Sequence, residues 1–168
     1  MAKAEIGLKQ VLIGDPAVDG GMSTDLTEVG ATVSDTFTVT AEQPQVTDLT
    51  IEEQDDPFYS ITTPGKRTIA WDSYNVSPAS LVKLCGGTAT VDASANNVWE
   101  APLSAPEIIV SVKALTKAGG IIEMPKVKLS ATPQFNLKKT DAVKVSVTGT
   151  VLVPDKANTS PVKYTQKA

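Results

Sequence analysis

Few residues in this chain have side chains that could carry out catalysis. It contains one cysteine, Cys85, and no histidine, which excludes a Ser-His-Asp triad, a Cys-His pair and any histidine-containing metal site. A single cysteine also excludes a disulfide framework within the chain. Without a neighbouring base, Cys85 is more simply explained as a packing residue than as a nucleophile. We therefore expect no enzymatic activity and no cofactor.

Carboxylates gather in one short stretch of the sequence. Glu52, Glu53, Asp55 and Asp56 could bind a divalent cation, but their spacing is not that of an EF-hand loop. Asp48 and Glu52 could in principle form a glycosidase pair. Hydroxyl side chains around them and the lack of an aromatic platform favour a solvated acidic wall, so we predict neither a metal site nor a catalytic site here.

Charge is distributed unevenly along the chain. Residues 1–60 contain 12 acidic and 2 basic side chains, whereas residues 61–168 contain 7 acidic and 13 basic ones. Opposite signs in the two halves are compatible with head-to-tail association, in which an acidic face meets a basic face of the next copy. The alternative is that both halves interleave in one fold and the charges mix. The basic half holds 12 lysines and 1 arginine with few aromatics, which is unlike a nucleic-acid readout surface.

The elements that must position these residues are mostly strands. Val, Thr and Ile account for 48 of the 168 residues, and branched side chains at this density favour strands. Short alternating segments are separated by Gly, Pro, Asn and Asp clusters. We predict a mainly β protein, an antiparallel β-sandwich or small barrel with one short flanking α-helix and a long hairpin. A single domain would span residues 1–168, with a long loop or arm at 14–33 and a mobile C-terminal tail at 154–168.

Two neighbouring segments, 34–40 and 46–52, alternate in the same way. Their alternation predicts an antiparallel hairpin with one wet face and one buried face. The residues assigned to the wet face are Thr36, Thr38, Thr40, Asp48, Thr50 and Glu52, and those assigned to the buried face are Phe37, Val39, Leu49 and Ile51. A slip of one residue would bury the carboxylates instead.

One segment breaks the strand pattern. Ser77 followed by Pro78 is typical of a helix start, with a capping hydroxyl and a proline in the first turn. Leu81, Leu84 and Cys85 then share one face, and a Gly-Gly pair ends the helix. We predict a helix over Ser77–Cys85 that packs through these three residues.

No apolar run suggests a signal peptide or a transmembrane span. Lys9 and Gln10 interrupt the short apolar stretch near the N-terminus. We expect no membrane anchor and folding in the cytoplasm of the producing cell.

The segment around the predicted helix resembles a feature of phage tail tube (major tail) proteins. Its sequence is NVSPASLVKLCGGT, at 75–88, and Trp99-Glu100-Ala101-Pro102 follows at a similar place. The acidic stretch at 51–57 and the run from Leu137 into 143–154 are also similar to parts of that family. The resemblance covers roughly residues 34–154 as an order of elements.

The resemblance implies a structural protein of the virion tail, made and assembled in the host bacterial cytoplasm. Subunits would form homohexameric rings that stack head to tail, and their hairpins would join into a barrel around a lumen. A tape-measure protein would fill the lumen during assembly, and DNA would later pass through it without specific binding. Related rings build the tubes of contractile injection machines.

The resemblance also suggests roles for individual residues. The wet-face residues Thr36, Thr38, Thr40, Asp48, Thr50 and Glu52 would face the lumen, and an acidic wall would repel DNA where a basic wall would bind it. Candidates for ring-to-ring contacts are Asp15, Asp19, Asp25 and Glu28 in the long loop.

Two other functions are compatible with a β-sandwich. An immunoglobulin-like adhesin or capsid decoration module would not need an acidic hairpin. A sugar-binding sandwich would need exposed aromatic residues, yet only 5% of the chain is aromatic.

Overall fold

The computed structural model describes residues 4–167 and shows a mainly β protein with antiparallel sheets. Strands account for 50% of the residues and helix for 5%, which confirms the predicted fold class. The largest sheet has the order β2-β1-β9-β10-β11-β6-β3, with β12 paired to β10. Its strands are β1 (Leu8–Gly14), β2 (Thr27–Glu28), β3 (Thr38–Ala41), β6 (Arg67–Ser73), β9 (Ile108–Thr116), β10 (Ile121–Gln134), β11 (Lys144–Val151) and β12 (Lys163–Thr165).

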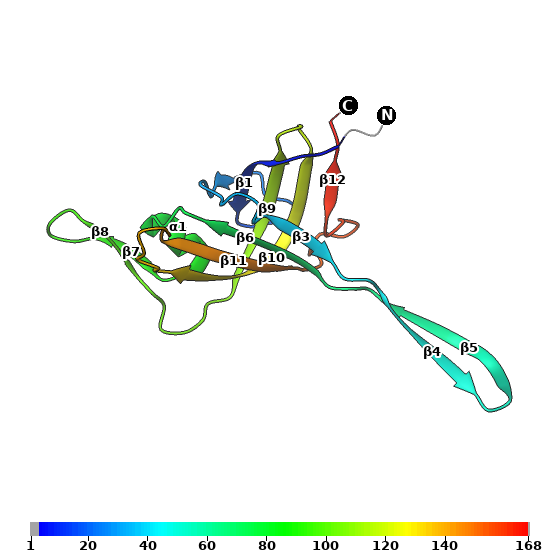
Figure 1. The fold of residues 1–168 in the computed structure, drawn as a ribbon. Coiled ribbons are helices and arrows are strands. Elements are labelled where there is room, and N and C mark those ends of the chain that lie inside the picture. The colour runs from blue at the N-terminus through cyan, green and yellow to red at the C-terminus, as the bar shows by residue number, and fades with distance from the viewer. Residues whose placement is uncertain (1–3, 168) are drawn as a thin grey trace.

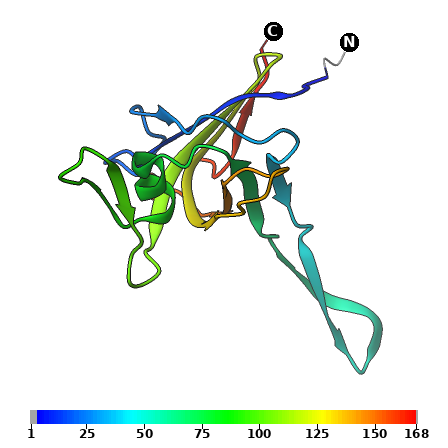
Figure 2. The same ribbon diagram turned by 60° about the vertical axis from the view of Figure 1, so that its left-hand side comes forward.

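This sheet bends over itself around one core, as Figures 1 and 2 show. Alternate side chains of β1, β6, β9, β10 and β11 point inward, because apolar residues in these strands recur every second position. The buried cluster includes Val11, Ile69, Trp71, Val112 and Val147. Among the described residues the sheet does not close into a barrel, so the sandwich alternative is the one that the architecture matches.

A bulge in β10 allows the sheet to bend. The register between β9 and β10 shifts between Met124 and Val127, where Pro125 cannot donate a backbone hydrogen bond to its neighbour. The freed carbonyl of Pro125 accepts a hydrogen bond of 2.7 Å from the buried Ser111 hydroxyl.

Helix α1 (Pro78–Cys85) lies where the sequence predicts it. Ser77 is the N-cap, and its hydroxyl accepts a hydrogen bond from the Ser80 backbone N–H. The buried residues of the helix are Leu81, Leu84 and Cys85. After the helix, Gly87 has a φ of 89°, and a side chain there would collide with the Glu100 carbonyl, so glycine is required at this turn.

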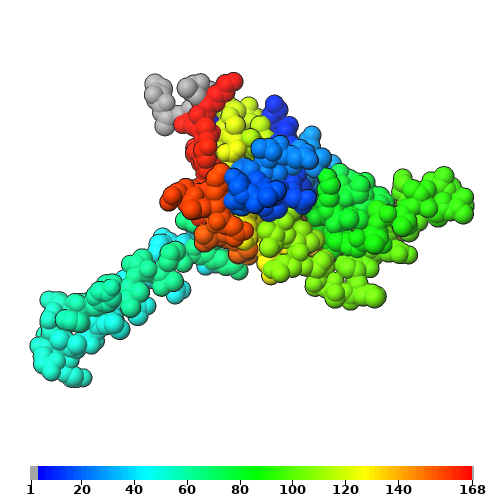
Figure 3. Space-filling model, turned by 180° about the vertical axis from the view of Figure 1, so that it is seen from behind, coloured from blue at the N-terminus to red at the C-terminus, as the bar shows by residue number. Residues whose placement is uncertain are grey.

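Two hairpins form separate two-stranded sheets. One pairs β4 (Gln45–Ile51) with β5 (Gln54–Thr63), and the other pairs β7 (Thr88–Val91) with β8 (Asn97–Glu100). They extend from opposite sides of the body (Figures 1 and 3).

The loop at 14–33 is not a free arm in the structure. Val29 is buried, and the backbone N–H of the buried Ser23 donates to the Ser111 hydroxyl. Within the same loop, β2 pairs with β1. The loop packs against the sheet because it covers side chains of β1 and β9 that would otherwise be exposed.

The segment predicted as a mobile tail, 154–168, also lies against the body over its described residues. Pro154 is buried, and β12 pairs with β10. Asp155 accepts from the Lys126 ammonium at 2.7 Å, and Lys156 bonds Asp19 at the same distance. Backbone pairing and these two ion pairs hold this segment in place, which its polar composition did not indicate.

No helix among residues 4–167 is long and apolar enough to cross a membrane.

Candidate interaction surface: the projecting hairpin

The β4–β5 hairpin extends away from the body, and both of its faces are open to solvent (Figures 1 and 3). Every residue of β4 and of β5 is exposed. The strands pair from Gln45 opposite Thr63 to Leu49 opposite Tyr59, and the chain reverses at Glu52-Glu53. No other strand of the described chain pairs with either one, so each has an unpaired edge.

The predicted partner of 46–52 was wrong. Segment 34–40 does not form a hairpin with it, because β3 pairs with β6, with Val39 opposite Ile69. The turn-like residues at 41–44 lead the chain out of the body rather than reversing it. The return strand starts at Gln54, in an acidic stretch that resembles a turn in sequence.

The structure therefore separates the six residues predicted to share a wet face. Thr36 precedes β3, and its hydroxyl donates to the Val33 carbonyl at 2.8 Å and accepts from the Asp72 backbone N–H at 3.1 Å. Both hydrogen bonds are made within the subunit, so Thr36 has a structural role and does not belong to the predicted wet face. Glu52 is corrected from a strand position to the hairpin turn.

Thr38 and Thr40 lie on the large sheet, in a band of hydroxyl side chains. Thr38 is opposite Ala70, and Thr40 is opposite Thr68; these in turn pair with Thr148 and Thr150 of β11. Directly paired residues share a sheet face. Both threonines are exposed, and they form a surface distinct from the hairpin.

Asp48 and Thr50 do share one face of the hairpin, by strand alternation. Asp48 lies opposite Ser60, and Thr62 lies opposite Val46 on the same face. We call this set, Val46, Asp48, Thr50, Phe58, Ser60 and Thr62, the polar face of the hairpin, since hydroxyls and a carboxylate make up most of it.

The opposite face of the hairpin is apolar toward the turn, whereas Gln45, Thr47 and Thr63 lie on the same face nearer the body. Leu49 and Ile51 were predicted to be buried, but they are 48% and 41% exposed. Tyr59 and Ile61 from β5 share this face and are 60% and 45% exposed. We call these four residues the apolar face. The predicted burial was wrong for the single chain because the hairpin projects beyond the core and no segment of residues 4–167 covers it.

Sequence reasoning missed Tyr59 and Ile61 as parts of this surface. The signal was present, because Tyr59, Ile61 and Thr63 alternate with Ser60 and Thr62. With the turn at Glu52-Glu53, Tyr59 lies opposite Leu49, so Tyr59 and Ile61 share the face of Leu49 and Ile51.

The hairpin is strongly acidic. Residues 45–63 contain five carboxylates and no lysine or arginine. The carboxylates are Asp48, Glu52, Glu53, Asp55 and Asp56, and none forms an ion pair within residues 4–167. Part of the negative charge of the N-terminal half is thus concentrated away from the lysines of the body.

The four residues proposed for ring contacts are all exposed but are not gathered together. Asp19 pairs with Lys156, whose hydrogen bond holds the pKa of the Asp19 carboxyl below its ordinary value. Asp15 and Asp25 line one hollow, and Glu28 lines another. Their contact with a neighbouring subunit stays a prediction.

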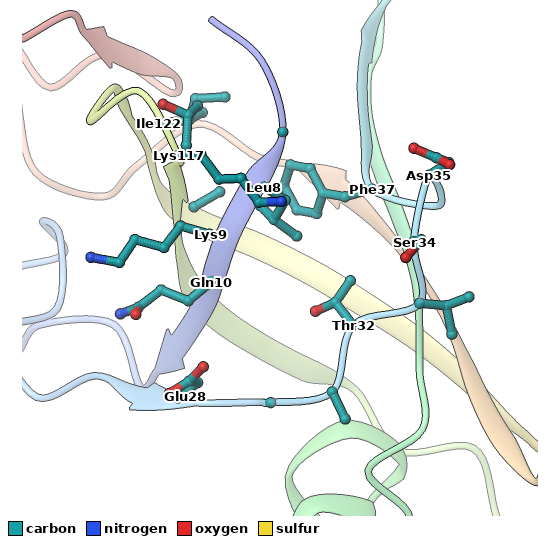
Figure 4. Close-up of a pocket in the computed structure, with 16 residues that line it drawn as sticks. Leu8, Lys9, Gln10, Glu28, Thr32, Ser34, Asp35, Phe37, Lys117 and Ile122 are labelled. Carbon is teal, nitrogen blue, oxygen red and sulfur yellow. The ribbon is translucent and has the colours of Figure 1, made fainter.

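The hollow beside Glu28 lies between β1 and the segment 30–37 and has a volume of about 620 Å³. Figure 4 shows Lys9, Glu28, Asp35 and Lys117 around it. No ion pair joins these four groups in the described chain. No group of three or more His, Cys, Asp or Glu residues within 4–167 is placed to hold a metal ion. We find no convergence of reactive groups in this hollow.

Cys85 and the two tryptophans are parts of the packing. Burial raises the pKa of the Cys85 thiol, which keeps it protonated at neutral pH. Trp71 is 1% exposed, so it cannot stack on a sugar. The Trp99 indole N–H donates to the Gly86 carbonyl at 2.9 Å and fixes β8 to the end of the helix.

Among the described residues, the hairpin is therefore the surface that most clearly lacks a partner. It combines an apolar face, a polar face and unpaired strand edges. No protein-family model matches this sequence, and no curated protein matches it at a significant level.

Proposed function

We propose that this chain is a structural protein that polymerises through its β4–β5 hairpin, in the manner of a phage tail tube protein. Copies would form hexameric rings that stack head to tail into a tube. The hairpins of neighbouring copies would lie side by side and form a continuous barrel around a lumen. This is the function that the resemblance around α1 implies, and the hairpin is the observation that supports it most.

An isolated two-stranded hairpin is at best marginally stable in water. Here the apolar face has four residues that are each at least 41% exposed. Such a surface is typical of an interaction site. The unpaired edges of β4 and β5 can accept strands from neighbouring copies, which removes the exposed edges and covers the apolar residues together.

In such a barrel the polar face of each hairpin would point toward the lumen. Asp48 and Ser60 are directly opposite each other on this face, and no cation lies within residues 45–63. A wall of carboxylates and hydroxyls repels DNA phosphates, whereas a basic wall would bind them by counterion release. A tape-measure protein would occupy the lumen during assembly in the host bacterial cytoplasm, and the genome would pass through it in the virion.

A shortened hairpin tests this proposal. Gln45 and Thr63 are directly paired, so an Asn-Gly turn in place of residues 46–62 closes the two strands. We expect the shortened chain to keep its melting temperature, because the removed residues lie outside the core. It should stay monomeric in sedimentation and form no rings or tubes in negative-stain microscopy. Tubes formed by the shortened chain would contradict the proposal.

The wild-type chain is the second arm of this experiment. It should form rings or tubes as its concentration rises. A wild-type chain that stays monomeric at high concentration and several salt concentrations would overturn the proposal in favour of the adhesin or decoration-module alternative.

The position of the polar face can be tested separately with Asp48→Lys. This exposed substitution should leave folding and assembly intact. Tubes of the variant should retain DNA at low salt and release it at high salt. Glu100→Lys, on the exposed end of β8, is the matched control and should not retain DNA. Equal DNA behaviour of both variants and the wild type would place Asp48 outside the lumen.

A further inference from the structure

A hairpin that inserts between copies needs a counterpart on the neighbouring copy. The loop between β10 and β11, residues 135–143, has complementary properties. Phe135 is 60% exposed and Leu137 is 88% exposed, and the exposed Lys138 and Lys139 follow directly. The loop thus combines apolar and basic groups, as the hairpin combines apolar and acidic ones.

We infer that the apolar face and acidic turn of the β4–β5 hairpin dock on the β10–β11 loop of a second copy of this chain. Leu49, Ile51, Tyr59 and Ile61 would contact Phe135 and Leu137, and the carboxylates at the turn would face Lys138 and Lys139. This inference rests on the proposed assembly and names the surface that receives the hairpin.

The hairpin and the β10–β11 loop lie at opposite ends of the β6–β11 strand pair. The hairpin joins β6 at Arg67, whereas the loop joins β11 at Lys144. In the antiparallel pair of β6 and β11, Val145 is opposite Ser73 and Thr150 is opposite Thr68. The loop is therefore beside the far end of β6 from the hairpin (Figure 1).

Surfaces at opposite ends of a subunit cannot pair with each other within one copy. They favour a heterologous contact, in which each copy uses one surface to receive its neighbour and the other to reach the next. Such contacts repeat, and they give rings when the rotation closes and filaments when it does not. This is the type of contact that a ring-forming or tube-forming protein requires.

The charged groups of both surfaces lack ion-pair partners within residues 4–167. Neither Lys138 nor Lys139 forms an ion pair within residues 4–167, whereas Lys113, Lys126 and Lys128 each have a carboxylate partner. Asp141 is the one acidic residue of the loop. Its backbone N–H donates to the Lys138 carbonyl, and with two lysines and one aspartate the loop has a net charge of +1.

Charge reversal in two separate chains tests the contact. The first variant is Glu52→Lys/Glu53→Lys, and the second is Lys138→Glu/Lys139→Glu. Each variant alone would place like charges at every contact, so its threshold concentration for assembly at low salt should rise about tenfold or more. Mixed in equal amounts they should co-assemble, because each reversed hairpin then meets a reversed loop and each wild-type hairpin meets a wild-type loop.

The control is Lys9→Glu/Lys117→Glu, which reverses two lysines of the hollow in Figure 4. Its hairpin and loop are unchanged, so it should assemble alone at the wild-type threshold concentration, but it should not restore assembly of the reversed-hairpin variant. Recovery in this control mixture, no recovery in the main mixture, or wild-type assembly of each reversed variant alone would overturn the inference while leaving the proposed assembly in place. A wild-type chain that never assembles would overturn both.

Disulfide cross-linking gives a second measurement that does not depend on charge. Glu53→Cys in one chain and Lys138→Cys in another should form a mixed disulfide when the two chains assemble under mild oxidation. The native Cys85 is buried and should not compete. If assembled chains fail to form this cross-link and form one between Glu53→Cys and Lys117→Cys, the receiving surface is the hollow and the inference is wrong.

Discussion

Replacing Leu49 and Ile51 by serine should weaken assembly without changing the stability of the single subunit. Both side chains belong to the apolar face and are 48% and 41% exposed in the single chain. Their exposed parts contribute nothing to subunit folding, because they contact only solvent. They become buried only on assembly, when the hairpin packs against a neighbouring copy.

The size of the effect follows from these exposed fractions. Full burial of a Leu or Ile side chain contributes about 1.5–3 kcal/mol. Burying the remaining 48% and 41% on assembly therefore contributes together about 1.3–2.7 kcal/mol per subunit. Since about 1.4 kcal/mol changes an equilibrium constant tenfold, the double variant should raise the threshold concentration for tube formation by about 10- to 100-fold.

Sedimentation of polymer across a concentration series measures this threshold, and a thermal melt of dilute protein measures subunit stability. Val18→Ser and Val91→Ser are matched controls, since these valines are 109% and 65% exposed outside the hairpin. An unchanged threshold in the Leu49→Ser/Ile51→Ser variant would refute the reasoning. So would an equal increase in the controls, or a large drop in the melting temperature of the dilute variant.

Three further predictions concern the folded subunit. Leu84 is 0% exposed, so Leu84→Ala should destabilise the chain by about 2–5 kcal/mol and lower the melting temperature by about 5–20 °C; Lys83→Ala on the exposed side of the helix should change it little, and equal losses would show that the helix face is wrong. Lys144 donates a hydrogen bond of 2.8 Å to Asp72 and holds the pKa of that carboxyl below its ordinary value. The stabilisation is therefore present above the ordinary pKa and is lost as the pH falls through the lower folded value. Asp72→Asn should reduce stability at pH 7 and show a shallower decline in melting temperature below about pH 4, whereas parallel pH curves would contradict this assignment. Burial raises the pKa of the Cys85 thiol, so iodoacetamide at pH 8 should react with it far more slowly in the folded chain than after denaturation, as peptide mass measurements will show.

Local patterns in the sequence were sufficient for the fold class and the helix. Alternation at every second residue predicts strands because side chains in a strand point alternately to opposite faces. Ser77 and Pro78 predict the helix start because the Ser77 hydroxyl caps a backbone N–H only three residues away. The spacing of Leu81, Leu84 and Cys85 predicts its buried face. These features depend on residues that are close together in the sequence, so the sequence alone determines them.

Strand pairing depended on the tertiary structure. Segment 34–40 was expected to pair with 46–52, yet β3 pairs with β6 about 30 residues away, and β4 pairs with β5. The alternation of Phe37 and Val39 is equally compatible with both partners. The choice is made by burial against the core, where Phe37 packs near Trp71 with ring centroids 6.3 Å apart, and the sequence does not encode that contact locally.

The exposure of the hairpin was also decided only in three dimensions. Alternation places Leu49 and Ile51 on one face of β4 and Asp48 and Thr50 on the other. It cannot show whether the apolar face is covered by the same chain or by a second copy. The structure shows that β4 and β5 extend beyond the core, where no other element of the described residues covers them. The sequence thus determined the alternation of side chains within β4, but not the strand that pairs with it. Only the tertiary structure decided which of these faces lacks a partner, because coverage depends on where every other segment of the chain lies.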